Sequence, residues 1–233
     1  MSVLNNIDLN IITSLVKARM QPYSVIESYS EEAVDLFFET IRNDLQHPVG
    51  FEASSYTKFP TGLILEYLKQ GHRFYLDKKI PEIELSISQF LSAADTQKIK
   101  GEDFFLIVYL FDEYKKSLIQ HISAEEKTVF PYVSQLLKNQ SIPCDTFRKH
   151  NLEGCATLMH FIKTHTDTEK DLAEIKTILN SYQINKPGMT PFNLLIKQLD
   201  IFEVDLHIHS KIEEEVLVPL ALEMEQKLLK SSM

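Results

Sequence analysis

The segment HISAEEKTVFP, residues 121–131, has a close counterpart near the end of the chain in HSKIEEEVLVP, residues 209–219. In each copy a histidine is followed by glutamate at +4 and +5 and by proline at +10. Both copies lie in stretches whose apolar residues recur at helical spacing. Because residues four apart on a helix lie roughly 40° apart in projection, about one turn from each other, each copy presents an imidazole and a carboxylate toward one point.

This repeat has two interpretations. A single His-x-x-x-Glu is commonly a solvated helix face, because glutamate is a good helix former. Two copies that share the Glu-Glu pair and the proline are much less expected by chance, and apolar residues such as Ile122 and Ile212 flank both. Imidazole with carboxylate suits iron, manganese or zinc, and two facing pairs suit a two-metal site in a helical bundle. We therefore interpret the repeat as a metal centre.

The composition of the chain favours an all-helical globular protein. Its 233 residues are 44% hydrophobic, with six glycines and no tryptophan. Leucine, isoleucine, glutamate and lysine fill long stretches, and all but isoleucine are among the better helix formers. No glycine-rich phosphate loop, Cys-x-x-Cys pair or Gly-x-Ser-x-Gly elbow is present.

Charge and cysteine usage limit the kinds of partner and the cellular compartment that we expect. The net charge is −9, and no cluster of lysine and arginine is present, so we expect no nucleic-acid surface. The longest apolar run, residues 104–111, is far too short for a membrane span, and the N-terminus does not resemble a signal peptide. Two cysteines, Cys144 and Cys155, fit free thiols in a reducing compartment. We expect a cytoplasmic protein.

The helical pattern predicts an antiparallel four-helix bundle over residues 61–225. Its four long helices are expected over residues 62–91 with a kink at Pro81, over 101–138, from 145 or 146 onward, and from Thr190-Pro191 to 217. Thr61 is a plausible N-cap, and a short helix is expected over 171–179. Residues 1–60 are predicted to be a small helical extension with no assigned chemistry, and residues 226–233 a polar tail.

Other histidines are candidates of lower specificity. His72 lies at helical spacing with Leu68 and Tyr75, where a lone histidine is more often a hydrogen-bonded core residue than a ligand. The third helix carries His150 and His160, which are roughly 80° apart around the helix and so should not both face one metal pair. Position alone does not choose between these two.

With the helices placed, the pattern resembles the hemerythrin-like (HHE cation-binding) family, and most closely its iron–sulfur cluster repair branch. The resemblance covers about residues 60–225. Its motifs are the repeat itself together with LKQGHRFYL at 68–76, FRKHN at 147–151 and FEVDLHIH at 202–209. The repeated His-x-x-x-Glu with its proline is the specific part, and the motifs on the first and third helices are weaker.

The resemblance implies a non-haem centre of two iron ions that can hold an oxo bridge. Its terminal ligands would be four histidines, and two glutamates would bridge the irons: His72, His121, His150 and His209, with Glu125 and Glu213. The family position selects His150 over His160. His207, Glu126 and Glu214 would then lie behind the ligands or at the surface.

The resemblance also implies a function. We expect a stress-response protein that acts on nitric oxide or on damaged iron–sulfur clusters, so its partner would be a diatomic molecule or a damaged iron–sulfur protein. One alternative is a non-catalytic sensor or carrier of oxygen, and another is a metal-free interaction bundle. Two features depart from the relatives: four histidines fit where oxygen carriers use five, and residues 1–60 lack the cysteine pair common in repair proteins.

Overall fold

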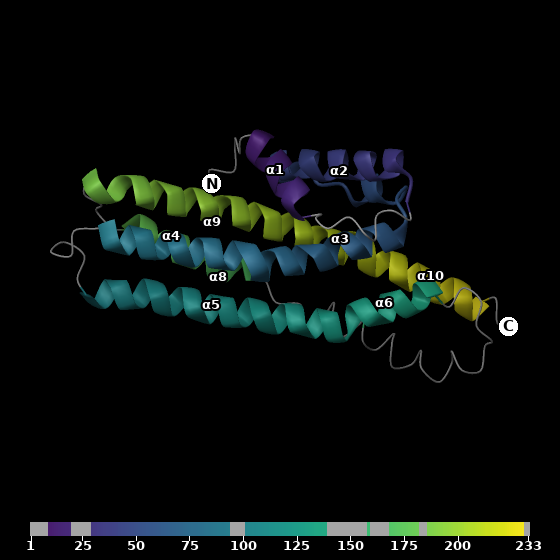
Figure 1. The fold of residues 1–233 in the computed structure, drawn as a ribbon. Helices are drawn as coiled ribbons and strands as arrows, with labels where there is room; N and C mark the ends of the chain where they lie inside the picture. Colours follow the sequence, from purple (N-terminus) through teal and green to yellow (C-terminus); the bar gives the residue numbers. More distant parts are fainter. Residues whose placement is uncertain are drawn as a thin grey trace.

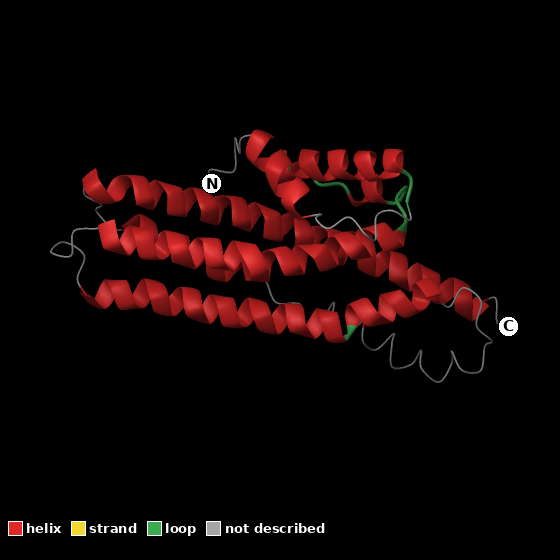
Figure 2. Ribbon diagram, viewed as in Figure 1, coloured by secondary structure: helices red, strands yellow, loops and turns green. Residues whose placement is uncertain are grey.

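The computed structural model describes residues 9–19, 29–93, 101–138, 158, 168–181 and 186–230. These residues form helices and short connections, and no strand occurs among them (Figure 2). The predicted all-α helical bundle is therefore confirmed. Within the same ranges, no helix has the length and apolar character needed to cross a membrane.

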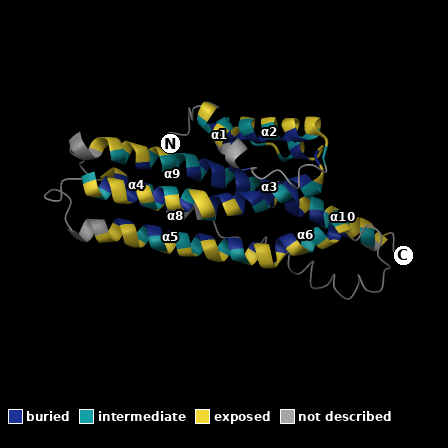
Figure 3. Cartoon of the chain, viewed as in Figure 1, coloured by how far each residue is buried: buried dark blue, intermediate teal, exposed yellow. Residues whose placement is uncertain are grey.

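In the part of the chain that the structure describes, the bundle is built from long helical rods (Figure 1). They are α3 (Thr61–Phe74) with α4 (Ile80–Ala93), α5 (Gly101–Lys127) with α6 (Val129–Lys138), α8 (Thr168–Ser181), and α9 (Lys186–Ile212) with α10 (Val218–Lys230). The α3–α4 rod runs opposite to α5–α6 and to α9–α10, as the colours of Figure 1 show. Contacts of α9 with α4 and α8, and of α5 with α8, join the rods, and their buried faces turn inward (Figure 3).

The N-terminal helices lie over one side of this bundle, against α3 and α9 (Figure 1). They are α1 (Leu9–Arg19) and α2 (Glu31–Gln46), followed by two short 3-10 turns, Pro48–Gly50 and Ala53–Tyr56. Ser30 caps α2 as its sequence suggests, with Oγ accepting from the Ala33 amide at 3.3 Å. Ile12, Val16 and Phe37 are buried, so the N-terminal helices share one apolar core with the bundle.

Three prolines explain three irregularities in the long rods. A proline cannot bond the carbonyl four residues earlier and its ring clashes with that carbonyl, which favours a kink, a widened turn or a break there. A π-helical turn, Tyr75–Lys79, precedes Pro81, and another, Glu213–Leu217, surrounds the carbonyl four residues before Pro219. The α5–α6 rod breaks at Thr128, next to the carbonyl that Pro131 leaves unbonded. Single π-helical turns of this kind are frequent at functional sites.

Some predicted helix boundaries are wrong. The N-cap of α3 is Pro60 and not Thr61, and no side chain caps this end. The last long helix begins at Lys186, so Pro191 lies inside it. Pro187, and not Pro191, occupies the first turn, where a proline has no helical hydrogen bond to lose. Helix α8 is longer than expected, at Thr168–Ser181. The expected start of the third long helix lies outside the described residues.

Candidate metal centre

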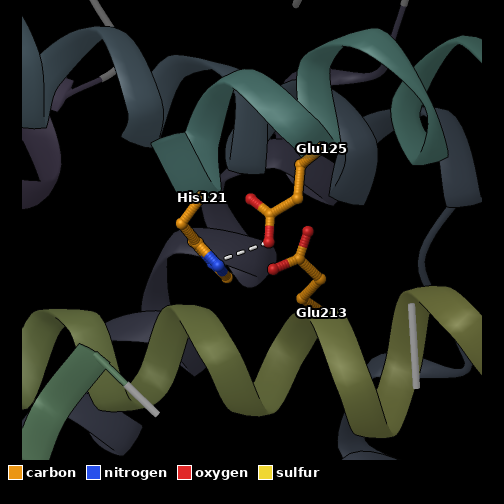
Figure 4. A group of neighbouring side chains, drawn as sticks. All are labelled: His121, Glu125 and Glu213. Carbon is orange, nitrogen blue, oxygen red and sulfur yellow. Dashed lines mark ion pairs between the residues drawn. The ribbon is translucent and has the colours of Figure 1, made fainter. Parts of the chain in front are cut away.

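Five of the six proposed ligand side chains meet inside the bundle. His72 comes from α3, His121 and Glu125 from α5, His209 from the last turn of α9, and Glu213 from the π-helical turn that follows. Figure 4 shows His121, Glu125 and Glu213 pointing toward one another between α5 and the α9–α10 rod. The His121 side chain is 16% exposed and that of Glu125 2%, so the cluster approaches the surface at His121.

Glu125 lies between two imidazoles and turns one oxygen to each. Its Oε1 is 2.7 Å from His121 Nε2, and its Oε2 is 3.1 Å from His72 Nε2. His72 Nε2 is in turn 3.1 Å from His209 Nε2. Two ligand atoms at right angles on one metal, each at about 2.1 Å, lie about 3 Å apart. The spacing within the cluster therefore fits atoms that share a metal ion.

Glu213 brings a second carboxylate to the same place. Ligand atoms of His121, Glu125 and Glu213 all lie within 4.8 Å of one another. Burial, reinforced by the neighbouring charge of Glu125, raises the pKa of Glu213 well above its usual range. Two buried carboxylates in contact are costly when both are ionised, and a bound cation would remove that cost. The donor set thus fits a cation by its chemistry as well as by its spacing.

The outward nitrogen of His72 faces a carboxylate. Its Nδ1 is 3.1 Å from Glu126 Oε1, and this hydrogen bond lowers the pKa of Glu126. Burial opposes charge on His72, but the hydrogen bonds to Glu125 and Glu126 raise the pKa of its imidazole. An acceptor behind a ligating histidine keeps the hydrogen on the outer nitrogen and the lone pair toward the metal. Glu126 is therefore suited to orient His72.

The outward nitrogen of His209 faces a cation instead. Arg19, the last residue of α1, places Nη2 2.7 Å from His209 Nδ1 and Nη1 2.6 Å from Asp205 Oδ1. Burial, with His72 and Arg19 nearby, holds the pKa of His209 well below its usual range. No motif in residues 1–60 predicts any chemistry, so Arg19 is a residue of the site that the sequence alone did not identify. Gly71 inside a helical pattern and Asp205 on an apolar face were the available signals.

The remaining candidates are placed as follows. His150 and His160, with both cysteines, lie outside the described residues, so the geometry of the sixth proposed ligand is not described. Glu214 is exposed and accepts from Ser210 Oγ at 3.3 Å. His207 is half-buried.

The family model of the hemerythrin HHE cation-binding domain matches residues 82–221, more than half of the chain. The chain belongs to this family, and it is a hemerythrin-like, metal-binding helical protein. The matched range contains both copies of the repeat and begins after His72. It identifies the family and no branch within it. No curated protein and no solved structure matches the chain.

Proposed function

We propose that this protein holds a non-haem di-iron centre. The observation that carries the proposal is the position of Glu125, whose two oxygens face different imidazoles, those of His121 and His72. A carboxylate placed in this way is suited to bridge two metal ions. Imidazole and carboxylate together suit iron, and bundle cores of this kind are common hosts for paired metals.

The side chains divide into two groups around Glu125. His72 and His209 lie on the side of Oε2, and His121 lies on the side of Oε1 with Glu213 nearby. We propose that each group would hold one iron and that Glu125 and Glu213 would be shared between the two. His150 is proposed as the remaining ligand, from the resemblance alone.

We propose a role in the response to nitrosative or oxidative stress, either on nitric oxide or on damaged iron–sulfur clusters. An iron pair with exchangeable positions supplies binding and electron transfer to small diatomic molecules. The chain itself contributes a cluster of buried side chains that limits access of water, with His72 oriented by Glu126 and partial exposure at His121. Support for the stress role comes from the motifs shared with the repair branch. Cytoplasmic location is part of the same proposal.

Metal content tests the centre. We expect two irons per chain after iron-replete expression, with an absorption band in the near ultraviolet. His121→Ala and Glu213→Ala should lose both iron and band. Glu214→Ala is the matched control, because Glu214 belongs to the same repeat but is exposed and should leave both unchanged. Iron-free wild-type protein, or one zinc per chain, would contradict the di-iron proposal.

Turnover separates the stress role from sensing. With an electron donor and without oxygen, the iron-loaded protein should consume nitric oxide, or restore a damaged iron–sulfur protein, over many cycles. A protein that only shifts its spectrum in proportion to added nitric oxide would be a sensor or carrier. That result would leave the metal centre in place and remove the proposed activity.

A further inference from the structure

Arg19 is held inside the bundle by contacts that reach across three helices. Besides Asp205 and His209 of α9, its Nη1 donates to Tyr67 Oη at 2.7 Å and its Nη2 to Tyr75 Oη at 3.1 Å. The guanidinium lies over the Tyr67 ring, 4.2 Å from its centroid. Among the described residues, no other lysine or arginine is buried. The end of α1 therefore inserts a positive charge directly behind His209.

Helix α3 carries a glycine, Gly71, at the position where it meets the side chain of Arg19. A Cβ atom built on Gly71 would lie 1.9 Å from Arg19 Nη2 and 2.8 Å from its Cζ. Glycine within a helix is destabilising relative to alanine, yet only glycine leaves room here. Because the guanidinium is fixed by four polar partners, it cannot step aside cheaply. Gly71 is therefore a requirement of the inserted Arg19.

The contact between Arg19 and His209 conflicts with metal binding by His209. A guanidinium only donates hydrogen bonds, so His209 Nδ1 must be the acceptor. A neutral imidazole then carries its hydrogen on Nε2, the atom that faces His72 and the cluster. A metal ion needs a lone pair on Nε2, so the hydrogen of the neutral imidazole must move to Nδ1. There it would face an N–H of Arg19, and two donors would oppose each other. The positive charge of Arg19 also repels a nearby cation.

Asp205 offers an alternative partner for His209. It lies one helical turn before His209 on α9, so both side chains lie on the same face. One of its oxygens binds Arg19, while the other, Oδ2, is buried and makes no hydrogen bond with any described residue. Without Arg19, Asp205 could accept from His209 Nδ1. Such a carboxylate–histidine pair is the usual support for a ligating imidazole.

We propose that docking of α1 and metal binding through His209 oppose each other. With Arg19 inserted, His209 Nε2 is a poor ligand. When a metal binds, the hydrogen of His209 turns to Asp205 and Arg19 withdraws together with α1. By linkage, docking of α1 weakens metal binding by the same factor by which bound metal weakens docking of α1. Any factor that holds α1 away from the bundle therefore strengthens metal binding. The inference rests on the proposed metal centre and adds a movable N-terminal helix that responds to metal occupancy.

Metal affinity in two Arg19-directed variants tests this coupling. Ferrous ion would be titrated without oxygen against a competing chromophoric chelator, with zinc as a redox-inert second ion. Arg19→Gln removes the charge, and Gly71→Ala displaces the guanidinium while every charge and ligand stays. We expect both variants to bind about tenfold tighter than wild type. Lys176→Gln is the control, since Lys176 pairs with Asp200 and Glu203 of α9 but makes no contact with the cluster.

Hydrogen exchange provides a readout independent of activity. Amides of residues 9–19 should be protected in the metal-free wild-type protein and should exchange several-fold faster once metal is bound. The inference is wrong if both variants bind metal with the affinity of wild type and if the rate of amide exchange in α1 does not change when metal binds. Arg19 would then be only a structural anchor. Weaker binding in Gly71→Ala would also overturn it. Absence of metal binding in wild-type protein would instead overturn the proposed centre itself.

Discussion

The two copies of the repeat carry the same residue types but have different surroundings. Around the first copy, Glu126 reaches His72 Nδ1, and the helix breaks at Thr128. In the second copy, Glu214 is exposed, the helix continues through a π-helical turn, and Arg19 stands behind the histidine. The difference teaches that a repeated motif determines which side chains share a helix face, whereas neighbouring helices determine what lies behind them.

The largest effect should come from the residue that joins the two sides of the cluster. Glu125→Ala removes the carboxylate that faces both His121 and His72, so we expect iron content to fall from two per chain to none. Elemental analysis of protein expressed with excess iron measures this. Glu126→Ala, which changes the next residue, should still retain iron. Retention of one iron in Glu125→Ala would mean that the two groups bind independently.

A second prediction compares the second glutamate of each copy. Glu126→Gln replaces the carboxylate acceptor of His72 Nδ1 with an amide, and loss of such a support typically weakens metal binding by about 10- to 100-fold. Glu214→Gln should change affinity by less than about twofold, because Glu214 is exposed and contacts Ser210. Chelator competition measures both. Equal effects in the two variants would show that the copies are functionally equivalent after all.

The smallest effect concerns the stability of the metal-free protein. Burial and Glu125 raise the pKa of Glu213 well above its usual range. The folded state therefore holds the Glu213 proton to a higher pH than the unfolded state does. Its stabilising contribution is fully present below the unfolded pKa and is lost as pH rises through the folded pKa. Glu213→Gln keeps a neutral side chain at every pH, so it should stabilise the metal-free fold near pH 7.5 by about 2 kcal/mol.

Urea unfolding of metal-free wild-type protein and of Glu213→Gln, at pH 5 and pH 7.5, measures this effect. We expect the advantage of the variant to shrink at the lower pH, and we expect it to bind no metal. The same comparison with Glu215→Gln, an exposed neighbour, should show little change. If Glu213→Gln is less stable than wild type at both pH values, the carboxylate pair does not strain the metal-free fold.

Much of the architecture could be predicted because it depends on local sequence. Helical periodicity and composition predict the all-α class, and Ser30 marks the start of α2. Pro81, Pro131 and Pro219 indicate where the long rods are irregular, because a proline inside a helix loses a backbone hydrogen bond and its ring crowds the preceding turn. The start of α9 was predicted wrongly because Pro187 and Pro191 both suit the first turn of a helix, and local sequence does not distinguish them.

Local spacing by itself determined that His121 and Glu125 share a helix face, and that His209 and Glu213 do so too. Only the tertiary structure decided that His72 joins them, that Glu126 supports His72, and that Arg19 reaches His209 from α1. Arg19 and His209 are 190 positions apart, and no periodic pattern links them. Helix geometry relates residues within a few turns, whereas packing alone brings distant side chains into contact.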